Sequence, residues 1–79
     1  MSVVVYTLPN CVQCEMTKKM LNKNNIEFDS VNLAENEDAY ELVKSMGFQT
    51  APVVFADGDS WGGFRIDKIN ALASEQKSA

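Results

Sequence analysis

The chain contains two cysteines, Cys11 and Cys14, which stand three positions apart. Two sulfurs at this spacing can meet in one disulfide, but the loop that it closes is too short to hold a small fold together as the bridges of a secreted scaffold do. A Cys-X-X-Cys pair is typical instead of proteins whose dithiol is oxidised and reduced in turn. We therefore predict that this pair carries thiol-disulfide chemistry.

The surroundings of the pair predict different roles for its two sulfurs. Cys11 stands at the start of a predicted helix, where unpaired backbone N–H groups and a partial positive charge stabilise a thiolate. Because the chain has no histidine, a Cys-His nucleophile pair is excluded, and the helix end must activate the thiol. We expect the Cys11 thiolate to attack a substrate disulfide and Cys14 to attack the resulting mixed disulfide, which releases the reduced substrate.

Two other interpretations of the pair stay open. Cys-X-X-Cys also begins many zinc sites, but structural zinc usually takes four protein ligands, and this chain offers only two cysteine thiols and no histidine. Such a site would need a second chain, which gives a metal-bridging dimer. The cysteines could also be two buried thiols without chemistry. The redox interpretation, with no bound metal, is the one that the sequence favours.

The residues on either side of the pair predict the elements that position it. A β-branched and aromatic run over residues 2–7 indicates a buried strand, and Pro9-Asn10 ends it just before Cys11. From Val12 to about Asn24, apolar residues recur at helical spacing, while lysines fill the other faces. The pair is therefore predicted to lie between a strand and the start of a helix.

The remaining sequence predicts five further elements. In chain order they are a short strand at 26–33, a helix between about 36 and 47, a strand at 53–56, a short strand around 60–61 that Gly62 and Gly63 break, and a helix at 66–73. Asp57-Gly58 indicates a hairpin between the last two strands. We expect the three methionines Met16, Met20 and Met46 to fill the core and the polar tail at 74–79 to fray.

The order β-α-β-α-β-β-α predicts an α/β fold with a four-stranded mixed sheet flanked by three helices. No linker, repeat or low-complexity segment interrupts residues 1–79, so we expect a single domain. The formal net charge of −4 opposes binding to nucleic acid. The longest wholly apolar run, residues 3–6, is far shorter than the roughly 18 residues of a membrane span, and no basic segment of the kind that begins a signal peptide precedes it. We expect a cytoplasmic monomer.

Four segments resemble the NrdH-redoxins, which are glutaredoxin-like proteins of the thioredoxin superfamily: Tyr6-Thr7, Cys11-Val12-Gln13-Cys14, Ala51-Pro52-Val53-Val54 and Trp61-Gly62-Gly63-Phe64-Arg65-Ile66-Asp67. The match spans residues 3 to about 73. It implies a thioredoxin-like, glutaredoxin-type fold and no bound cofactor. It also implies that thioredoxin reductase, rather than glutathione, reduces the chain with electrons from NADPH, and that the chain passes them to class Ib ribonucleotide reductase.

The resemblance also implies which residues meet a partner. Ala51-Pro52 would be a cis peptide that faces the disulfide, and the backbone of Ala51 would pair with a bound partner strand. We expect Trp61 to face the partner rather than to cover the core. The candidate partner-binding residues are Val12, Gln13, Ala51, Pro52, Trp61, Gly63, Phe64 and Arg65.

The chain departs from the family's Trp-Ser-Gly-Phe-Arg-Pro segment at Gly62, where Ser is usual, and at Ile66, where Pro is usual. We expect a looser loop there but unchanged chemistry. Glutathione-dependent glutaredoxins commonly have a basic residue before the first cysteine and a Gly-Gly-X-Asp element; here Leu8 and Phe64-Arg65 take those places. These residues lack the charges that would hold glutathione, so weak binding is expected. A glutathione-dependent glutaredoxin is the alternative function.

Overall fold

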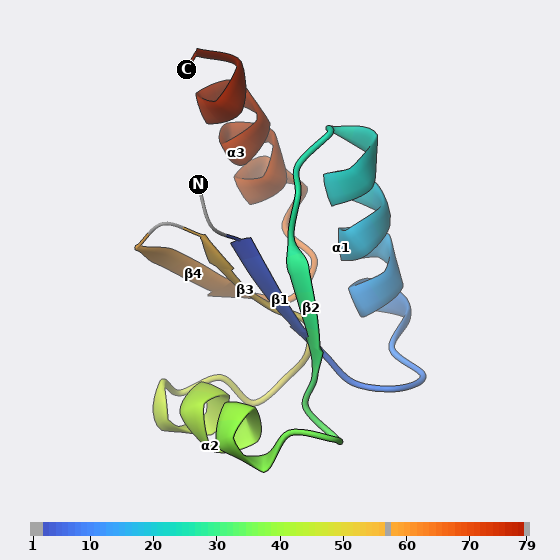
Figure 1. The fold of residues 1–79 in the computed structure, drawn as a ribbon, viewed down its shortest axis with the longest axis vertical. Helices are drawn as coiled ribbons and strands as arrows, with labels where there is room; N and C mark the ends of the chain where they lie inside the picture. The colour runs from blue at the N-terminus through green and yellow to red at the C-terminus, as the bar shows by residue number, and fades with distance from the viewer. Residues whose placement is uncertain (1–2, 57, 79) are drawn as a thin grey trace.

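A computed structural model describes residues 3–56 and 58–78 of the chain. Its elements follow the predicted order β-α-β-α-β-β-α, which confirms the α/β class (Figure 1). In chain order they are β1 (Val3–Thr7), α1 (Val12–Lys23), β2 (Asp29–Asn32), α2 (Glu37–Ser45), β3 (Val53–Ala56), β4 (Asp59–Gly62) and α3 (Ile66–Ser78).

The strands form one four-stranded mixed sheet in the order β2-β1-β3-β4. β1 runs parallel to β2, since α1 carries the chain back across the sheet, and β3 runs antiparallel to both β1 and β4. In the hairpin, Ala56 is opposite Asp59. Gly58, with φ of +88°, stands between the two strands, where glycine adopts a positive φ at no steric cost. Ser2 and Asp57, which belonged to the predicted strand and turn, lie outside the described residues.

Alternate residues of the strands supply two separate cores. Val5 and Val54 point to the face that α1 and α3 cover, where they pack with Leu21, Ile69 and other buried residues. The opposite face is covered by α2, whose Ala39 and Val43 pack with Val53 and Leu33. Figure 1 shows this division, with α2 on one side of the sheet and the other two helices across from it. The period of two along each strand places neighbours on opposite faces.

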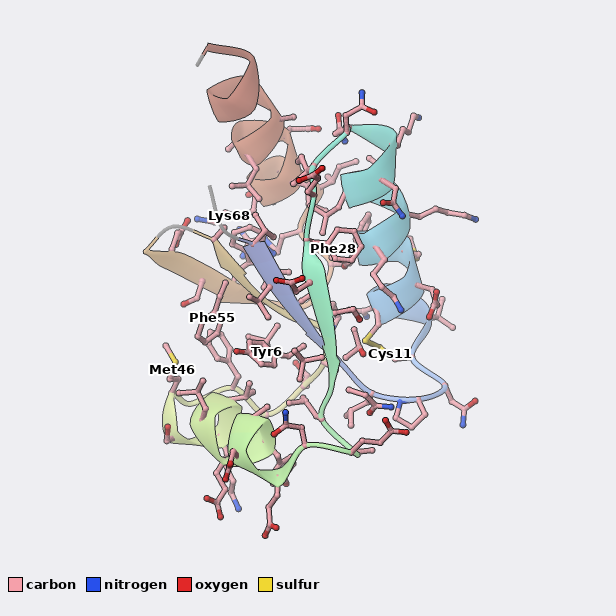
Figure 2. The ribbon with its side chains drawn as sticks, viewed as in Figure 1. Tyr6, Cys11, Phe28, Met46, Phe55 and Lys68 are labelled. Carbon is pink, nitrogen blue, oxygen red and sulfur yellow. A yellow bond between two sulfur atoms is a disulfide. The ribbon has the colours of Figure 1, made fainter. Side chains whose placement is uncertain are left out.

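Aromatic side chains fill the face beneath α2. The rings of Tyr6 and Phe55 meet edge to face with centroids 5.2 Å apart, and Figure 2 shows them side by side. α2 begins at Asn36, whose side-chain oxygen accepts the N–H of Ala39 at 3.0 Å. This cap satisfies one of the free donors at the helix start.

Within the described residues, no helix combines the length and apolar character that a membrane span requires.

Three predicted boundaries were wrong. The strand predicted at 26–33 is confined to Asp29–Asn32, because Ile26 is buried in the loop that follows α1. β4 continues through Gly62, which pairs with Val53, so that only Gly63 ends it. α3 continues to Ser78, beyond the predicted end of the helix at residue 73, since Glu, Gln and Lys are good helix formers.

The methionines were predicted as a group, but they lie in different surroundings. Met20 packs against the core beneath α1 and α3. Met16 and Met46 are exposed to 42% and 48%, and Figure 2 shows Met46 at the margin of α2. The prediction of core packing is therefore wrong for these two, because helical spacing gives the side of a helix but not how far the next layer reaches over it.

Candidate redox site

The sheet register brings three distant segments to one end of the sheet. β1 ends at Thr7, β3 begins at Val53 beside that end, and β4 ends at Gly62, which is opposite Val53. The chain that leaves β1 leads to the cysteine pair, the chain that enters β3 carries the Ala-Pro dipeptide, and the chain that leaves β4 carries residues 63–65. The fold therefore gathers the predicted site residues in one region.

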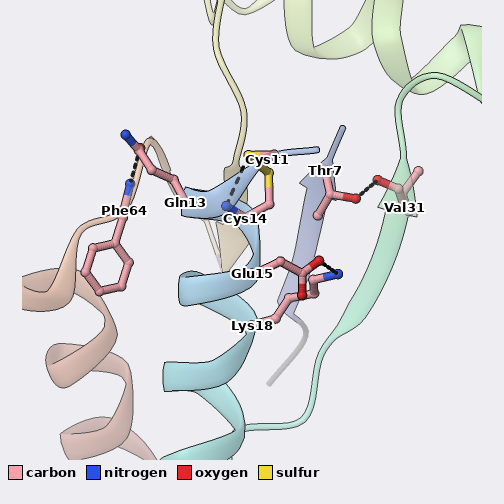
Figure 3. Close-up of a disulfide and its surroundings, with 8 residues drawn as sticks. All are labelled: Thr7, Cys11, Gln13, Cys14, Glu15, Lys18, Val31 and Phe64. Carbon is pink, nitrogen blue, oxygen red and sulfur yellow. Dashed lines mark hydrogen bonds and ion pairs between the residues drawn. A yellow bond between two sulfur atoms is a disulfide. The ribbon is translucent and has the colours of Figure 1, made fainter. Parts of the chain in front are cut away.

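The cysteine pair forms a disulfide at the start of α1, as predicted. Cys11 is the N-cap of the helix, with an extended backbone, and its Cα lies 5.2 Å from that of Cys14. The Sγ of Cys11 accepts the backbone N–H of Cys14 at 3.1 Å (Figure 3). The helix end therefore presents a donor to the sulfur that would carry the negative charge after reduction.

The two sulfurs differ in their access to solvent. Cys11 is partly exposed, whereas Cys14 is exposed to only 1%. Val12, which stands between them in the sequence, is exposed to 74% and provides apolar surface next to Cys11. A disulfide of another molecule can therefore reach Cys11 first, and the sulfur within reach of Cys14 is that of Cys11.

The peptide bond between Ala51 and Pro52 is cis, which confirms the prediction from the family resemblance. Pro52 is fully buried and Ala51 is partly exposed. The carbonyl of Pro52 accepts the N–H of Gly63 at 2.7 Å. This hydrogen bond joins the segment before β3 to the segment after β4, and Gly63 reaches it with φ of +82°, a conformation that favours glycine.

Gln13, the third residue of the Cys-X-X-Cys motif, connects α1 with the same loop. Its Oε1 accepts the backbone N–H of Phe64 at 3.3 Å, across 51 positions of sequence (Figure 3). The ring of Phe64 is partly buried against the core beneath α1 and α3. Sequence reasoning placed both residues at the site but had no signal for this bond, since it depends on how the loop folds.

Arg65 is held by a neighbour on α3. Its guanidinium donates to both carboxylate oxygens of Asp67, at 3.2 and 3.0 Å. These hydrogen bonds, together with the attraction of opposite charges, raise the pKa of Arg65. The hydrogen bond from Arg65 is also the main reason that the pKa of Asp67 lies below its ordinary value. Arg65 therefore lies near the site but is already paired with a carboxylate.

Trp61 does not face a partner, so this prediction was wrong. The residue is exposed to only 4% and belongs to the core beneath α1 and α3. It pairs with Val54 in the sheet register and so points to the same face. Its Nε1 is buried without a hydrogen-bond partner among the described residues. The physical reason is the period of two along β4. Because the strand continues through Gly62, Trp61 keeps this alternation and its side chain points toward α1 and α3.

Phe48 explains the glycine that replaces the family's serine. A Cβ added at Gly62 would lie 3.1 Å from Cδ1 of Phe48, so the ring packs directly over the bare backbone. We expected a looser loop at this position, but Gly62 is paired in β4 and the next two residues donate to Pro52 and Gln13. Sequence analysis missed Phe48 because its contact depends on the path of the α2–β3 loop.

Gly62→Ser is expected to destabilise the fold by roughly 1 kcal/mol, because the Phe48 ring must shift to admit the new side chain. Thermal unfolding followed by circular dichroism measures this as a lower midpoint. Phe48→Leu in the same chain should remove most of the loss. An unchanged or higher midpoint for Gly62→Ser alone would show that the ring does not constrain this position.

A surface groove of about 350 Å³ lies against α2, and two of its lining residues flank site segments in the chain: Leu8 stands three positions before Cys11, and Thr50 directly precedes Ala51. It is assembled from four parts of the chain, and its lining includes Leu8, Leu33, Tyr40, Val43, Phe48 and Thr50. Leu8 and Tyr40 are exposed to 39% and 48%.

Within residues 3–56 and 58–78, no three histidine, cysteine or carboxylate residues are grouped as a metal site would need.

The chain is similar to known proteins over most of its length. The family model described as Glutaredoxin matches residues 3–61. The glutaredoxin-like protein NrdH of Salmonella typhimurium is 44% identical over 72 residues, which cover 91% of this chain and 89% of that protein. The protein of the same description from Lactococcus lactis is 42% identical over 71 residues, 90% of this chain and 99% of that one.

A solved structure with a similar fold is the glutaredoxin-like protein NrdH-redoxin from Escherichia coli, described as having a thioredoxin-like activity profile. It superimposes with a TM-score of 0.89 at 39% identity and covers 91% of this chain and 95% of that one. This similarity confirms the thioredoxin-like fold and the resemblance that the four sequence segments indicated.

Proposed function

Since this chain belongs to the glutaredoxin family and, within it, to the NrdH glutaredoxin-like proteins, we propose that it is a dithiol electron carrier that thioredoxin reductase reduces and that in turn reduces class Ib ribonucleotide reductase. A glutaredoxin-like protein with a Cys-X-X-Cys disulfide has thiol-disulfide oxidoreductase activity in general. The identity of the two partners is the further part of the proposal.

The asymmetry of the disulfide is the observation that carries the proposal. Cys11 is partly exposed and accepts an N–H at the helix end, while Cys14 is buried. In the reduced protein the Cys11 thiolate attacks one sulfur of a substrate disulfide, and the other substrate sulfur leaves as a thiolate. Cys14 then attacks Cys11, which releases the second substrate sulfur and closes the internal disulfide. Two electrons have moved to the substrate.

The charges around the site favour a protein as the electron donor. Leu8 carries no charge, and Arg65 is paired with Asp67. The Nζ of Lys18 lies 3.2 Å from Oε1 of Glu15. A small anionic thiol therefore meets few free cations here. The apolar groove against α2 and the exposed Val12 suit a larger, less charged surface. The thioredoxin-like activity profile of the relative from Escherichia coli supports the same choice.

Two alternatives compete with this proposal. A glutathione-dependent glutaredoxin is favoured by the family name and by Gly62-Gly63, and the experiment below separates it from the leading proposal. A metal-bridging dimer requires both sulfurs to reach a second chain. The burial of Cys14 disfavours that arrangement, since a shared metal takes its ligands from the surface.

Oxidation of NADPH is expected to follow reduction of a model disulfide when thioredoxin reductase supplies the electrons, and to stay near background with glutathione and glutathione reductase. The reason is that the reductase brings its own dithiol to Cys11, whereas glutathione finds few charge partners at the site. Absorbance at the NADPH band measures both arms, with a Cys11→Ser variant as the blank for each.

Turnover only with glutathione would contradict the proposed donor and support the glutaredoxin alternative. Turnover with thioredoxin reductase makes the second partner testable in the same mixture. Replacing the model disulfide by oxidised class Ib ribonucleotide reductase should restore nucleotide reduction, and failure to do so would remove that enzyme as the client.

A further inference from the structure

Three donor groups on one loop beside the disulfide are paired within the chain. On the segment from Gly63 to Arg65, the first N–H donates to the Pro52 carbonyl, the second to Gln13 and the guanidinium of the third to Asp67. Such donors are what a carboxylate of a small ligand would use. The loop that carries them lies at the same end of the sheet as the cysteines. Its hydrogen bonding therefore affects which thiol compounds can bind beside Cys11.

The bond from Phe64 to Gln13 differs from the other two. It joins two exposed groups at 3.3 Å, and an exposed N–H would be hydrated by water if the bond were absent, so the fold does not require it. Gly63 leaves the approach of Gln13 open, since even a Cβ there would lie 3.7 Å from Oε1. Figure 3 shows the Gln13 side chain extending from the start of α1 toward Phe64.

We propose that Gln13 is a specificity-determining residue: its side-chain oxygen occupies the Phe64 N–H and so denies that donor to the carboxylate of an anionic thiol. The inference rests on the proposed function, because it names the feature by which the site selects a protein donor over glutathione. A main-chain donor is available to a carboxylate only when no acceptor of the chain already holds it. Gln13 supplies that acceptor from within the cysteine motif itself.

The reaction that Gln13 restrains is reduction of the disulfide by two thiols. A glutathione thiolate attacks Cys11, the bond between Cys11 and Cys14 breaks, and Cys14 leaves as a thiolate that takes up a proton. A second glutathione thiolate then attacks the sulfur of the bound glutathione, which releases oxidised glutathione and the Cys11 thiolate. A carboxylate held by the Phe64 N–H would favour the first attack by positioning the incoming thiol.

Three variants separate the acceptor from the bulk of the side chain. Gln13→Met keeps the length but has no amide oxygen, Gln13→Ala removes both, and Gln13→Glu keeps an acceptor and adds a negative charge. For each, stopped-flow measurement gives the rate constant for reduction of the disulfide by glutathione and by glutathione diethyl ester, whose carboxylates are masked. Rates with a small reference disulfide correct for the ionisation of the two thiols. Reduction by dithiothreitol shows that each disulfide reacts.

The ratio of the glutathione rate to the ester rate is the readout. We expect a ratio near one for the natural chain and a ratio below one for Gln13→Glu, whose added charge repels the glutathione carboxylates. For Gln13→Met and Gln13→Ala we expect about tenfold higher ratios than for the natural chain, the effect of roughly one charge-assisted hydrogen bond. An unchanged ratio in Gln13→Met would overturn the proposal, and a rise in Gln13→Ala alone would assign the effect to bulk. A natural chain that dithiothreitol cannot reduce would instead contradict the proposed function.

Discussion

Cys14→Ser is expected to hold a substrate in a stable mixed disulfide through Cys11, whereas Cys11→Ser should form none and lose disulfide reduction. The difference follows from burial, because Cys11 is partly exposed at the helix end and Cys14 is exposed to only 1%. Without Cys14 the second attack cannot occur and the intermediate accumulates. Without Cys11 the remaining sulfur lies out of reach, which should cost at least about 10²-fold, the effect of misplacing a reacting group.

Non-reducing electrophoresis and intact mass measure this trapping directly after the reduced variants meet a protein disulfide. The double variant with serine at both positions is the control for non-covalent association. Equal trapping by the two single variants would mean that both sulfurs reach the substrate, and the assigned order of attack would be wrong. Trapping by Cys11→Ser alone would reverse the roles.

The local sequence predicted the chemistry because the chemistry is local. The spacing of Cys11 and Cys14, the strand before them and the helix after them are all properties of neighbouring residues, and each is found in the structure. The cis bond before Pro52 could not come from composition, since most X-Pro bonds are trans. It was predicted correctly through the resemblance, which carries information about tertiary surroundings that propensity lacks.

The errors arose where a residue's place depends on distant parts of the chain. Two adjacent glycines indicated the end of a strand at Gly62, but Gly62 pairs with Val53 and leaves room for the ring of Phe48. That pairing extends β4 and turns Trp61 inward. The bond between Gln13 and Phe64 spans 51 positions and left no trace in local sequence. Long-range register therefore decided these features, while helical and strand periods decided the element order.

Trp61→Ala is expected to lower the free energy of unfolding by about 3–5 kcal/mol, the cost of truncating a large buried aromatic residue. For a chain of 79 residues the whole stability is of the order of 4–12 kcal/mol, so much of it would be lost. Trp61→Phe should cost no more than about 1 kcal/mol. It keeps a buried six-membered aromatic ring and removes an indole N–H that is buried without a partner among the described residues.

Urea unfolding followed by circular dichroism measures both changes without relying on tryptophan fluorescence. Tyr40→Ala, which truncates an aromatic residue exposed to 48%, is the matched control and should change stability by less than about 0.5 kcal/mol. A partner-facing Trp61 would give the opposite pattern, with Trp61→Phe slowing turnover with thioredoxin reductase while Trp61→Ala left unfolding unchanged. Because Trp61 packs with Val54 and the residues of α1 and α3, we expect its loss to appear first in the unfolding midpoint.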